Sequence, residues 1–236
     1  MRRLAALALA VLPLAACSGE QGERAQQLLN RAQVAQARLT SASYEARMTF
    51  VMDGRRFSLV MDGGGYFKGP RAGDHLLTMR TDGVPEVGPV NMQLLVRRGQ
   101  ASMSMNGQRF SLPMSAAAKP QYDWSGTMLD LARYVKNVRV LEGRVANGER
   151  GSTITGVIDT ASMVTTASKL DAVAEAASLE NFADKLGDIH AAVFLSERTG
   201  LIRSAVITMS MEAEGKKADI ELTYRLNSTN KAVAGL

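Results

Sequence analysis

The strongest constraint on the fold is a two-residue alternation of apolar and polar side chains that runs through most of the chain. It first appears at residues 46–52, where apolar Ala46, Met48, Phe50 and Met52 are separated by single residues. Successive side chains of a strand point to opposite faces, so the pattern predicts strands with one buried face. The Asp53-Gly54 pair that follows predicts a tight hairpin turn, with a return strand after it.

The same pattern recurs along the chain and predicts about eleven strands. Tight turns are expected at Asn106-Gly107 and around Asn147-Gly148, whereas Gly63 to Gly65 and residues 83–90 are expected to be loops. Every short connection is typical of a hairpin, so the sheet should be largely antiparallel. The predicted strands are 43–52, 55–62, 74–82, 91–98, 101–105, 108–112, 136–145, 149–158, 189–197, 201–211 and 217–226.

Three segments show helical spacing instead. They are 20–40, a short stretch within 123–135, and 161–187, which is Ala-rich and divides near Ser178. No linker separates the strands into independent halves. We therefore expect one α+β domain, a curved antiparallel sheet with helices on one side.

The N-terminus has the features of a secretory signal. Arg2 and Arg3 precede an apolar run at 4–14, which is too short for a permanent membrane-spanning helix of about 20 residues. Ala15 and Ala16 supply small residues at a cleavage site, and Cys17 follows directly. The segment resembles a bacterial lipobox, which implies a signal peptide at 1–16, lipidation of Cys17 and a tether at 17–22. The alternative is an ordinary cleaved signal with an incidental Cys.

A lipidated Cys17 would place the protein on the extracytoplasmic face of the cell membrane or outer envelope. Two or more acyl chains anchor a protein stably, and the lone Cys would leave no free thiol in an oxidising compartment. Removal of residues 1–16 takes away two bases and no acid, which leaves 26 basic residues against 23 acidic ones. These charges are interspersed, so the sequence predicts no nucleic-acid partner.

The sequence contains none of the common catalytic motifs considered for a chain of this type. The chain lacks the nucleophile elbow, the zinc-protease helix motif and the phosphate-binding glycine loop. A thiolate zinc cluster needs several Cys, and the only two histidines, His75 and His190, stand far apart on predicted strands. We expect no enzyme activity, no metal and no cofactor.

Several predicted strands are apolar on both faces, for example at Leu94, Leu95 and Val96. A sheet that is wetted on one side would not need this pattern. Either helices and a second layer cover the two faces, or one face lines a cavity. Many of the 13 Met residues fall on the strands. Met suits a surface that accepts variable apolar ligands, but it also fills gaps in ordinary cores, and the residues alone leave both interpretations open.

The order of these features resembles the LppX/LprG-type envelope lipoproteins, which share the fold of the LolA- and LolB-like lipoprotein carriers. The similarity covers roughly residues 22–230. After the lipobox, leading helix and long hairpins, it rests on residues 121–124 (QYDW), 138–143 (VRVLEG), 153–156 (TITG) and 192–202 (AVFLSERTGLI).

The resemblance implies a half-barrel sheet within a domain over 23–230, closed by helices around an apolar cavity that holds acyl chains. The tail after Asn227 is polar and small, and we expect it to fray at 231–236. It implies no catalytic residue. The ligand would be an acylated lipid or a lipoprotein acyl chain, carried across the envelope with the possible help of an envelope transporter. The predicted cavity residues are Met48, Phe50, Met52, Phe57, Leu59, Met61, Leu94, Val96, Met103, Met105, Val193, Leu195 and Val206.

The alternative function is an envelope-stress sensor or regulatory lipoprotein that uses the same fold to bind a protein partner. Co-purified lipid would favour the carrier, and capture of a membrane protein by an empty domain would favour the regulator.

Membrane attachment is predicted to depend on Cys17. Replacement Cys17→Ser removes the only thiol that can receive a diacylglycerol group, so the variant should move from the membrane fraction to the soluble fraction. Intact-mass measurement should show the loss of the acyl groups. A variant that stays in the membrane fraction and still carries acyl chains would contradict the lipobox interpretation.

Overall fold

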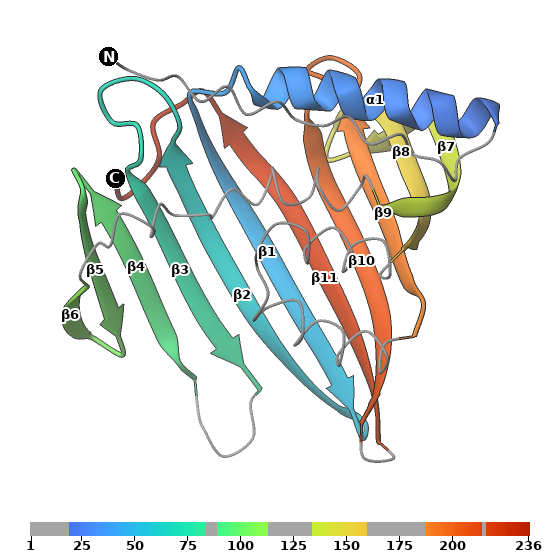
Figure 1. Cartoon of the computed structure of the whole chain (residues 1–236). Coiled ribbons are helices and arrows are strands. Elements are labelled where there is room, and N and C mark those ends of the chain that lie inside the picture. Colours follow the sequence, from blue (N-terminus) through green and yellow to red (C-terminus); the bar gives the residue numbers. More distant parts are fainter. Residues whose placement is uncertain (1–18, 84–88, 113–133, 160–186, 214–215) are drawn as a thin grey trace, which may run out of the picture.

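The structure is a computed structural model, and it describes residues 19–83, 89–112, 134–159, 187–213 and 216–236. In these residues the chain forms one helix and eleven strands (Figure 1). The elements are α1 (Glu20–Gln36), β1 (Ser41–Met52), β2 (Arg55–Tyr66), β3 (His75–Asp82), β4 (Asn91–Arg97), β5 (Gln100–Met105), β6 (Gln108–Leu112), β7 (Val135–Ala146), β8 (Glu149–Ile158), β9 (Ile189–Ser196), β10 (Ile202–Ala213) and β11 (Lys216–Thr229).

All eleven strands belong to one antiparallel sheet. Their order is β6-β5-β4-β3-β2-β1-β11-β10-β9-β8-β7, so each strand lies beside its neighbour in sequence except where β1 meets β11. The turn residues Asp53 and Asn106 both have positive φ, 51° and 48°, as two-residue hairpin turns with these residues require. The predicted antiparallel sheet is therefore confirmed, and it is an open sheet.

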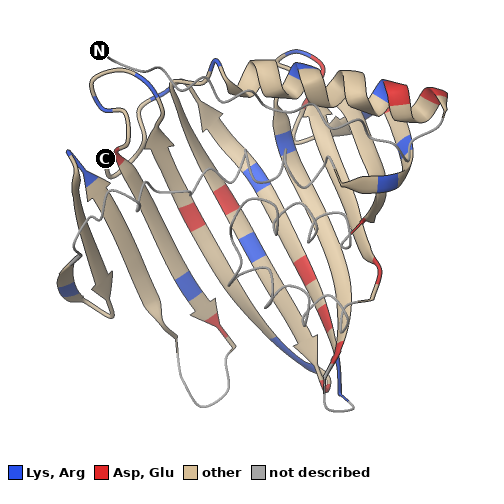
Figure 2. Ribbon diagram, viewed as in Figure 1, with Lys and Arg blue, Asp and Glu red and all other residues tan. Residues whose placement is uncertain are grey.

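The strand register divides the side chains between two faces. Met48 of β1 lies opposite Leu59 of β2 and Leu222 of β11, so these three side chains share one face. Thr49 lies opposite Ser58 and Glu221 on the other face. We call the first the inner face, because α1 packs on it, and the second the outer face. Figure 2 shows Lys and Arg interspersed with Asp and Glu along the central strands.

Helix α1 lies across one end of the strands, with its N-terminal end beside β7 and its C-terminal end beside β1 (Figure 1). Its apolar stripe is buried against the inner face and includes Leu29, 3% exposed. Ala46 of β1 is part of the same buried cluster and is 0% exposed. A polar contact holds the N-terminal end of α1 against β7: the Gln21 Oε1 accepts a hydrogen bond from the Val140 N–H at 2.8 Å. The helix begins at Glu20, inside the tether predicted at 17–22.

The three glycines predicted as a loop belong to strand β2, so this prediction was wrong. Gly63 lies opposite Tyr44 of β1, and a Cβ on Gly63 would stand 2.6 Å from the Tyr44 ring. A Cβ on Gly65 would meet the His75 ring of β3 at 2.6 Å. The glycines are therefore spaces for large side chains on neighbouring strands, which local sequence cannot distinguish from a turn signal.

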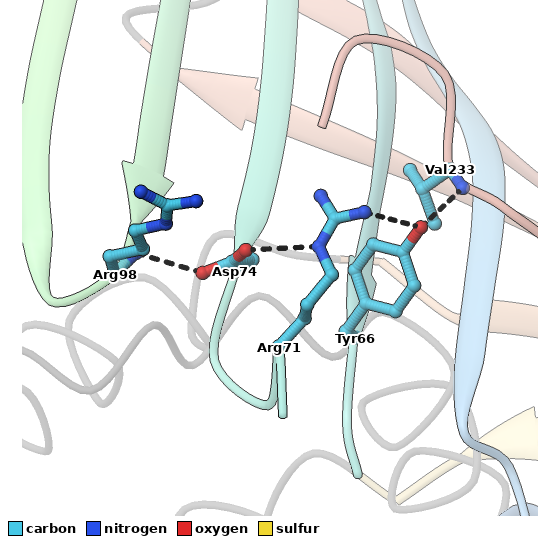
Figure 3. A network of polar contacts seen from close by, with 5 residues as sticks. All are labelled: Tyr66, Arg71, Asp74, Arg98 and Val233. Atoms are coloured by element: carbon cyan, nitrogen blue, oxygen red, sulfur yellow. Dashed lines mark hydrogen bonds and ion pairs between the residues drawn. The ribbon is translucent and has the colours of Figure 1, made fainter. Parts of the chain in front are cut away.

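The C-terminal tail, predicted to fray at 231–236, is held against the sheet instead. Val233 is buried, and its backbone N–H donates to the Tyr66 Oη at 3.1 Å (Figure 3). Asn230 caps the start of β1, where its Oδ1 accepts from the Thr40 N–H at 2.8 Å. These backbone groups have partners far away in sequence, so the tail is ordered by tertiary contacts.

A polar network joins this tail to two other segments (Figure 3). Tyr66 Oη also accepts from Arg71 Nη1 at 3.1 Å, and Arg71 Nε donates to Asp74 Oδ2 at 3.3 Å. The other oxygen of Asp74 accepts from the Arg98 N–H at 2.9 Å. The β2–β3 loop, the β4–β5 turn and the C-terminus are therefore fixed together by one buried carboxylate.

The helices predicted within 123–135 and 161–187, the signal peptide at 1–16 and Cys17 lie outside the described residues. Within the described part of the chain, no helix is both long and apolar enough to cross a membrane.

The charge of Asp74 is predicted to stabilise the fold. The Arg98 N–H, and then the Arg71 side chain, lower the pKa of Asp74 below its ordinary value of 3.8, against the opposing effect of burial. This stabilisation is present above about pH 4 and is lost as the pH falls through the folded pKa. At pH 7, Asp74→Asn should lower the free energy of unfolding by about 1–2 kcal/mol, measured by urea denaturation.

The matched control is Asp62→Asn, because Asp62 forms an exposed ion pair with Arg80. Such pairs contribute about 0–1 kcal/mol. The difference between wild type and Asp74→Asn should shrink at pH 3. A difference that is equally large at both pH values, or equal in the two variants, would contradict this role for Asp74.

Candidate ligand-binding face

Methionine is confined to one side of the sheet. Every Met in the described part of the chain lies on the inner face, because each is opposite an inner-face residue in the strand register. We call this set the methionine face; it consists of Met48, Met52, Met61, Met79, Met92, Met103, Met105, Met209 and Met211. Unbranched thioether side chains on a common surface make that surface adaptable and polarizable.

Most of the methionine face lies outside the main core. The core cluster that includes the α1 stripe consists mainly of Ala, Leu, Ile, Val and Tyr, with the rings of Tyr44 and Tyr224 6.4 Å apart, and Met61 is also a member. Met48 and Met79 are only partly buried and pack against that core. The core is thus built mostly of residues with fixed shape, and most of the flexible Met side chains lie outside it.

Large apolar side chains on this face are accessible. Met52 is 40% exposed, Met105 43% and Phe110 41%. Near the β1–β2 turn the rings of Phe50 and Phe57 stack with centroids 4.7 Å apart. Exposed apolar patches often mark binding sites, so these side chains make the inner face a candidate for ligand binding.

The structure brings most of the predicted cavity residues together on the inner face. Those that are half-buried or exposed there are Met48, Phe50, Met52, Phe57, Leu59, Leu94, Met103 and Met105. Met61, Val96, Val193 and Leu195 share the face but are at most 5% exposed, so in this structure they are core residues.

Val206 does not belong with the others, and its inclusion is corrected. It lies opposite Thr223 of β11 and Ala192 of β9, and it is 39% exposed on the outer face. Because side chains alternate along a strand, a residue one position away from the inward-facing Ala205 must point outward.

Phe110, Met92, Met209 and Met211 are on the same face but were not among the predicted cavity residues. The position of Phe110 could have been predicted from the sequence, because a two-residue turn at Asn106-Gly107 places Phe110 opposite Met103, as observed. Met209 and Met211 had no such signal, because their position depends on the pairing of β10 with β11.

Two hollows among the described residues are lined mostly by polar residues and glycine. A groove of about 610 Å³ lies on the outer side of the sheet, with Arg56, His190 and Glu221 among its lining residues. A cleft of about 190 Å³ between α1 and the β7–β9 end is lined by charged residues that include Arg24 and Glu142. The predicted closed apolar cavity therefore stays a prediction, and the apolar feature observed in the described residues is the methionine face.

The ionisable groups serve the architecture away from this face. Burial opposes ionisation of Glu149, but a hydrogen bond with Ser196 and the charges of Arg203 and Arg198 outweigh it and lower the pKa of that carboxyl. Within the described ranges, no group of three or more His, Cys, Asp or Glu residues is placed to hold a metal ion. The chemistry offered by the methionine face is apolar contact.

Comparison with known proteins supports the fold. No family model and no curated protein sequence matches the chain. Among solved structures, the lipoprotein LppX from Mycobacterium tuberculosis superposes with a TM-score of 0.52 at 17% identity, over 89% of this chain and 97% of LppX. LprF from Mycobacterium bovis gives a TM-score of 0.49 at 14% identity, over 90% of this chain and 95% of LprF. The chain has the LppX-type fold that the sequence resemblance implied.

Proposed function

We propose that this protein binds the acyl chains of a lipid or lipoprotein on its methionine face and carries them in the bacterial envelope. The observation that supports this most is the confinement of all the described Met residues to one face, together with exposed Phe110. The opposite face of the described strands holds no Met and is mostly polar, with scattered apolar residues such as Leu95 and Val206, so the asymmetry comes from the choice of residues.

Acyl chains fit this surface for an energetic reason. Burial of each methylene contributes about 0.8 kcal/mol, so one long chain gains roughly 10 kcal/mol before the costs of ordering. Met side chains adapt to chains of different length and unsaturation because they have three rotatable bonds. Half-buried residues such as Leu59 and Leu94 would lose their remaining water contact when the ligand binds.

A cation at the rim of the face suits an anionic headgroup. Arg55 lies opposite Met52, at the end of the methionine face, and is exposed. Arg56, its neighbour in sequence, points to the outer face and lines the outer groove. Only one residue of this pair is therefore positioned for a ligand on the inner face.

Anchoring by Cys17 completes the proposal. A lipidated tether ahead of α1 would hold the domain at the membrane surface, where it would meet acylated ligands, and an envelope transporter would be a natural source or acceptor. The absence of a catalytic motif in the sequence agrees with binding and transfer as opposed to covalent chemistry.

Leu94 and Leu95 provide a matched pair for testing the ligand face. Leu94 lies opposite Leu77 and Met103 on the inner face, whereas Leu95 lies opposite Leu76 and Ser102 on the outer face. Both are half-buried, so a Trp at either position should cost no more than about 1–3 kcal/mol of stability. Leu94→Trp should reduce the bound lipid several-fold, and Leu95→Trp should leave it unchanged, measured by lipid extraction and mass spectrometry. Equal lipid content in the two variants would contradict the assignment of the ligand to the inner face.

A second test uses the exposed edge strand. Phe110 and Arg109 are neighbours on β6 and are both exposed, but only Phe110 shares the inner face. Phe110→Glu should weaken binding of a fluorescent fatty acid at least fivefold, because a carboxylate would enter the apolar surface, whereas Arg109→Glu should not.

Native mass spectrometry of the purified wild-type protein should come before both variant tests, because it shows whether the protein carries a lipid. Masses of co-purified acylated molecules are expected. A protein that carries no lipid, takes up no fatty acid and instead captures a membrane protein would replace the carrier with the regulatory function.

A further inference from the structure

Four residues of the methionine face form a straight row across four neighbouring strands. Met61 of β2 lies opposite Met79 of β3, Met79 lies opposite Met92 of β4, and Met92 lies opposite Met105 of β5. We call these four the methionine row. Directly opposite residues on antiparallel strands have Cβ atoms about 4.5–5.5 Å apart, so each thioether has another within reach.

Accessibility increases along the row. Met61 is 5% exposed, Met79 and Met92 are intermediate, and Met105 is 43% exposed. The three outer residues therefore keep some contact with solvent, most of it at Met105 of β5, while Met61 at the inner end of the row belongs to the core.

The geometry and the donor type together suit a particular class of ion. With metal–sulfur bonds of about 2.3 Å, three sulfurs in a trigonal site lie about 4 Å apart. Met79 and Met105 stand on the two strands that flank Met92, so their Cβ atoms are about 10 Å apart, and the three rotatable bonds of Met let both thioethers turn toward Met92. Thioethers are soft, neutral ligands, and they select Cu(I)-like cations over ions that prefer oxygen or imidazole.

The surroundings of the methionine row also favour a soft, monovalent cation. Its inner-face neighbours include Leu77, Leu94 and Met103, which supply no carboxylate or imidazole. A divalent hard cation would lose its hydration there without compensation, whereas a monovalent soft cation needs only the sulfurs.

We propose that Met79, Met92 and Met105 form a binding site for a soft monovalent cation, Cu(I) or Ag(I). Met92 is the central ligand, because it lies opposite both of the others. This site is independent of the proposed lipid function, although both use the inner face.

The test uses the purified mature protein with Cys17→Ser, which removes the only thiol, after delipidation. Silver(I) is the redox-stable probe, copper(I) under anaerobic reducing conditions is the second arm, and zinc(II) is the control ion. Binding is followed by titration and by NMR of proteins labelled with ¹³C at the Met methyl groups.

One equivalent of silver(I) should bind and shift the methyl signals of Met79, Met92 and Met105, but not those of Met52 and Met209. Met92→Leu should lower the silver(I) affinity at least tenfold. Met52→Leu, on the same face but outside the row, should not. Copper(I) should shift the same three signals, and zinc(II) none of them.

The inference is overturned if silver(I) does not bind, if it shifts other methyl signals while these three stay unchanged, or if Met92→Leu binds as tightly as the parent protein. Fatty-acid binding is measured separately on the parent protein without any metal, so its result depends neither on silver(I) nor on a Met substitution. A failure of the cation site is therefore distinguishable from a failure of the proposed lipid function.

Discussion

The antiparallel pairing of β1 with β11 is the contact on which the rest of the structure depends. It runs from Ala42 opposite Thr229 to Met52 opposite Ala218, and it joins the first and last strands of the chain at the centre of the sheet. Without it, the β1–β6 and β7–β11 meanders would be two separate sheets. This pairing joins the strands that are most distant in sequence, so forming it has the largest loop-closure entropy cost. Burial of the core offsets that cost.

The central pairing also decides which residues share a surface. It aligns Met48 with Leu222 and Phe50 with Ile220, and each further strand continues the same faces through hairpin register. A slip of one residue would exchange the apolar and polar faces of a whole half. The bulge between Ser43 and Tyr44 lies at the end of the pairing, beside the glycines of β2 that accommodate Tyr44.

The rigid core and most of the methionine face occupy different parts of the inner face. Under α1, side chains of fixed shape such as Tyr224 and Ile202 are 2% exposed or less and form a rigid core. The other Met residues of the methionine face keep partial exposure, and only Met61 is a member of the core. The network around Asp74 holds the β2–β3 loop and the β4–β5 turn together at one end of the strands.

Much of the architecture could be predicted from the sequence, because hairpins are local. Turn pairs such as Asp53-Gly54 and Asn106-Gly107, with period-two alternation on both sides, determine strand positions and the register within each hairpin. What sequence could not give was contact between distant segments: the strand character of Gly63 to Gly65 depends on Tyr44 and His75, and the ordered tail depends on Tyr66. The misassignment of Val206 has the same origin, because which face of β10 is inner follows from its pairing with β11. Local alternation thus determined which residues of each hairpin share a face. Only the tertiary pairing of distant strands decided which faces of the different hairpins form the same side of the sheet.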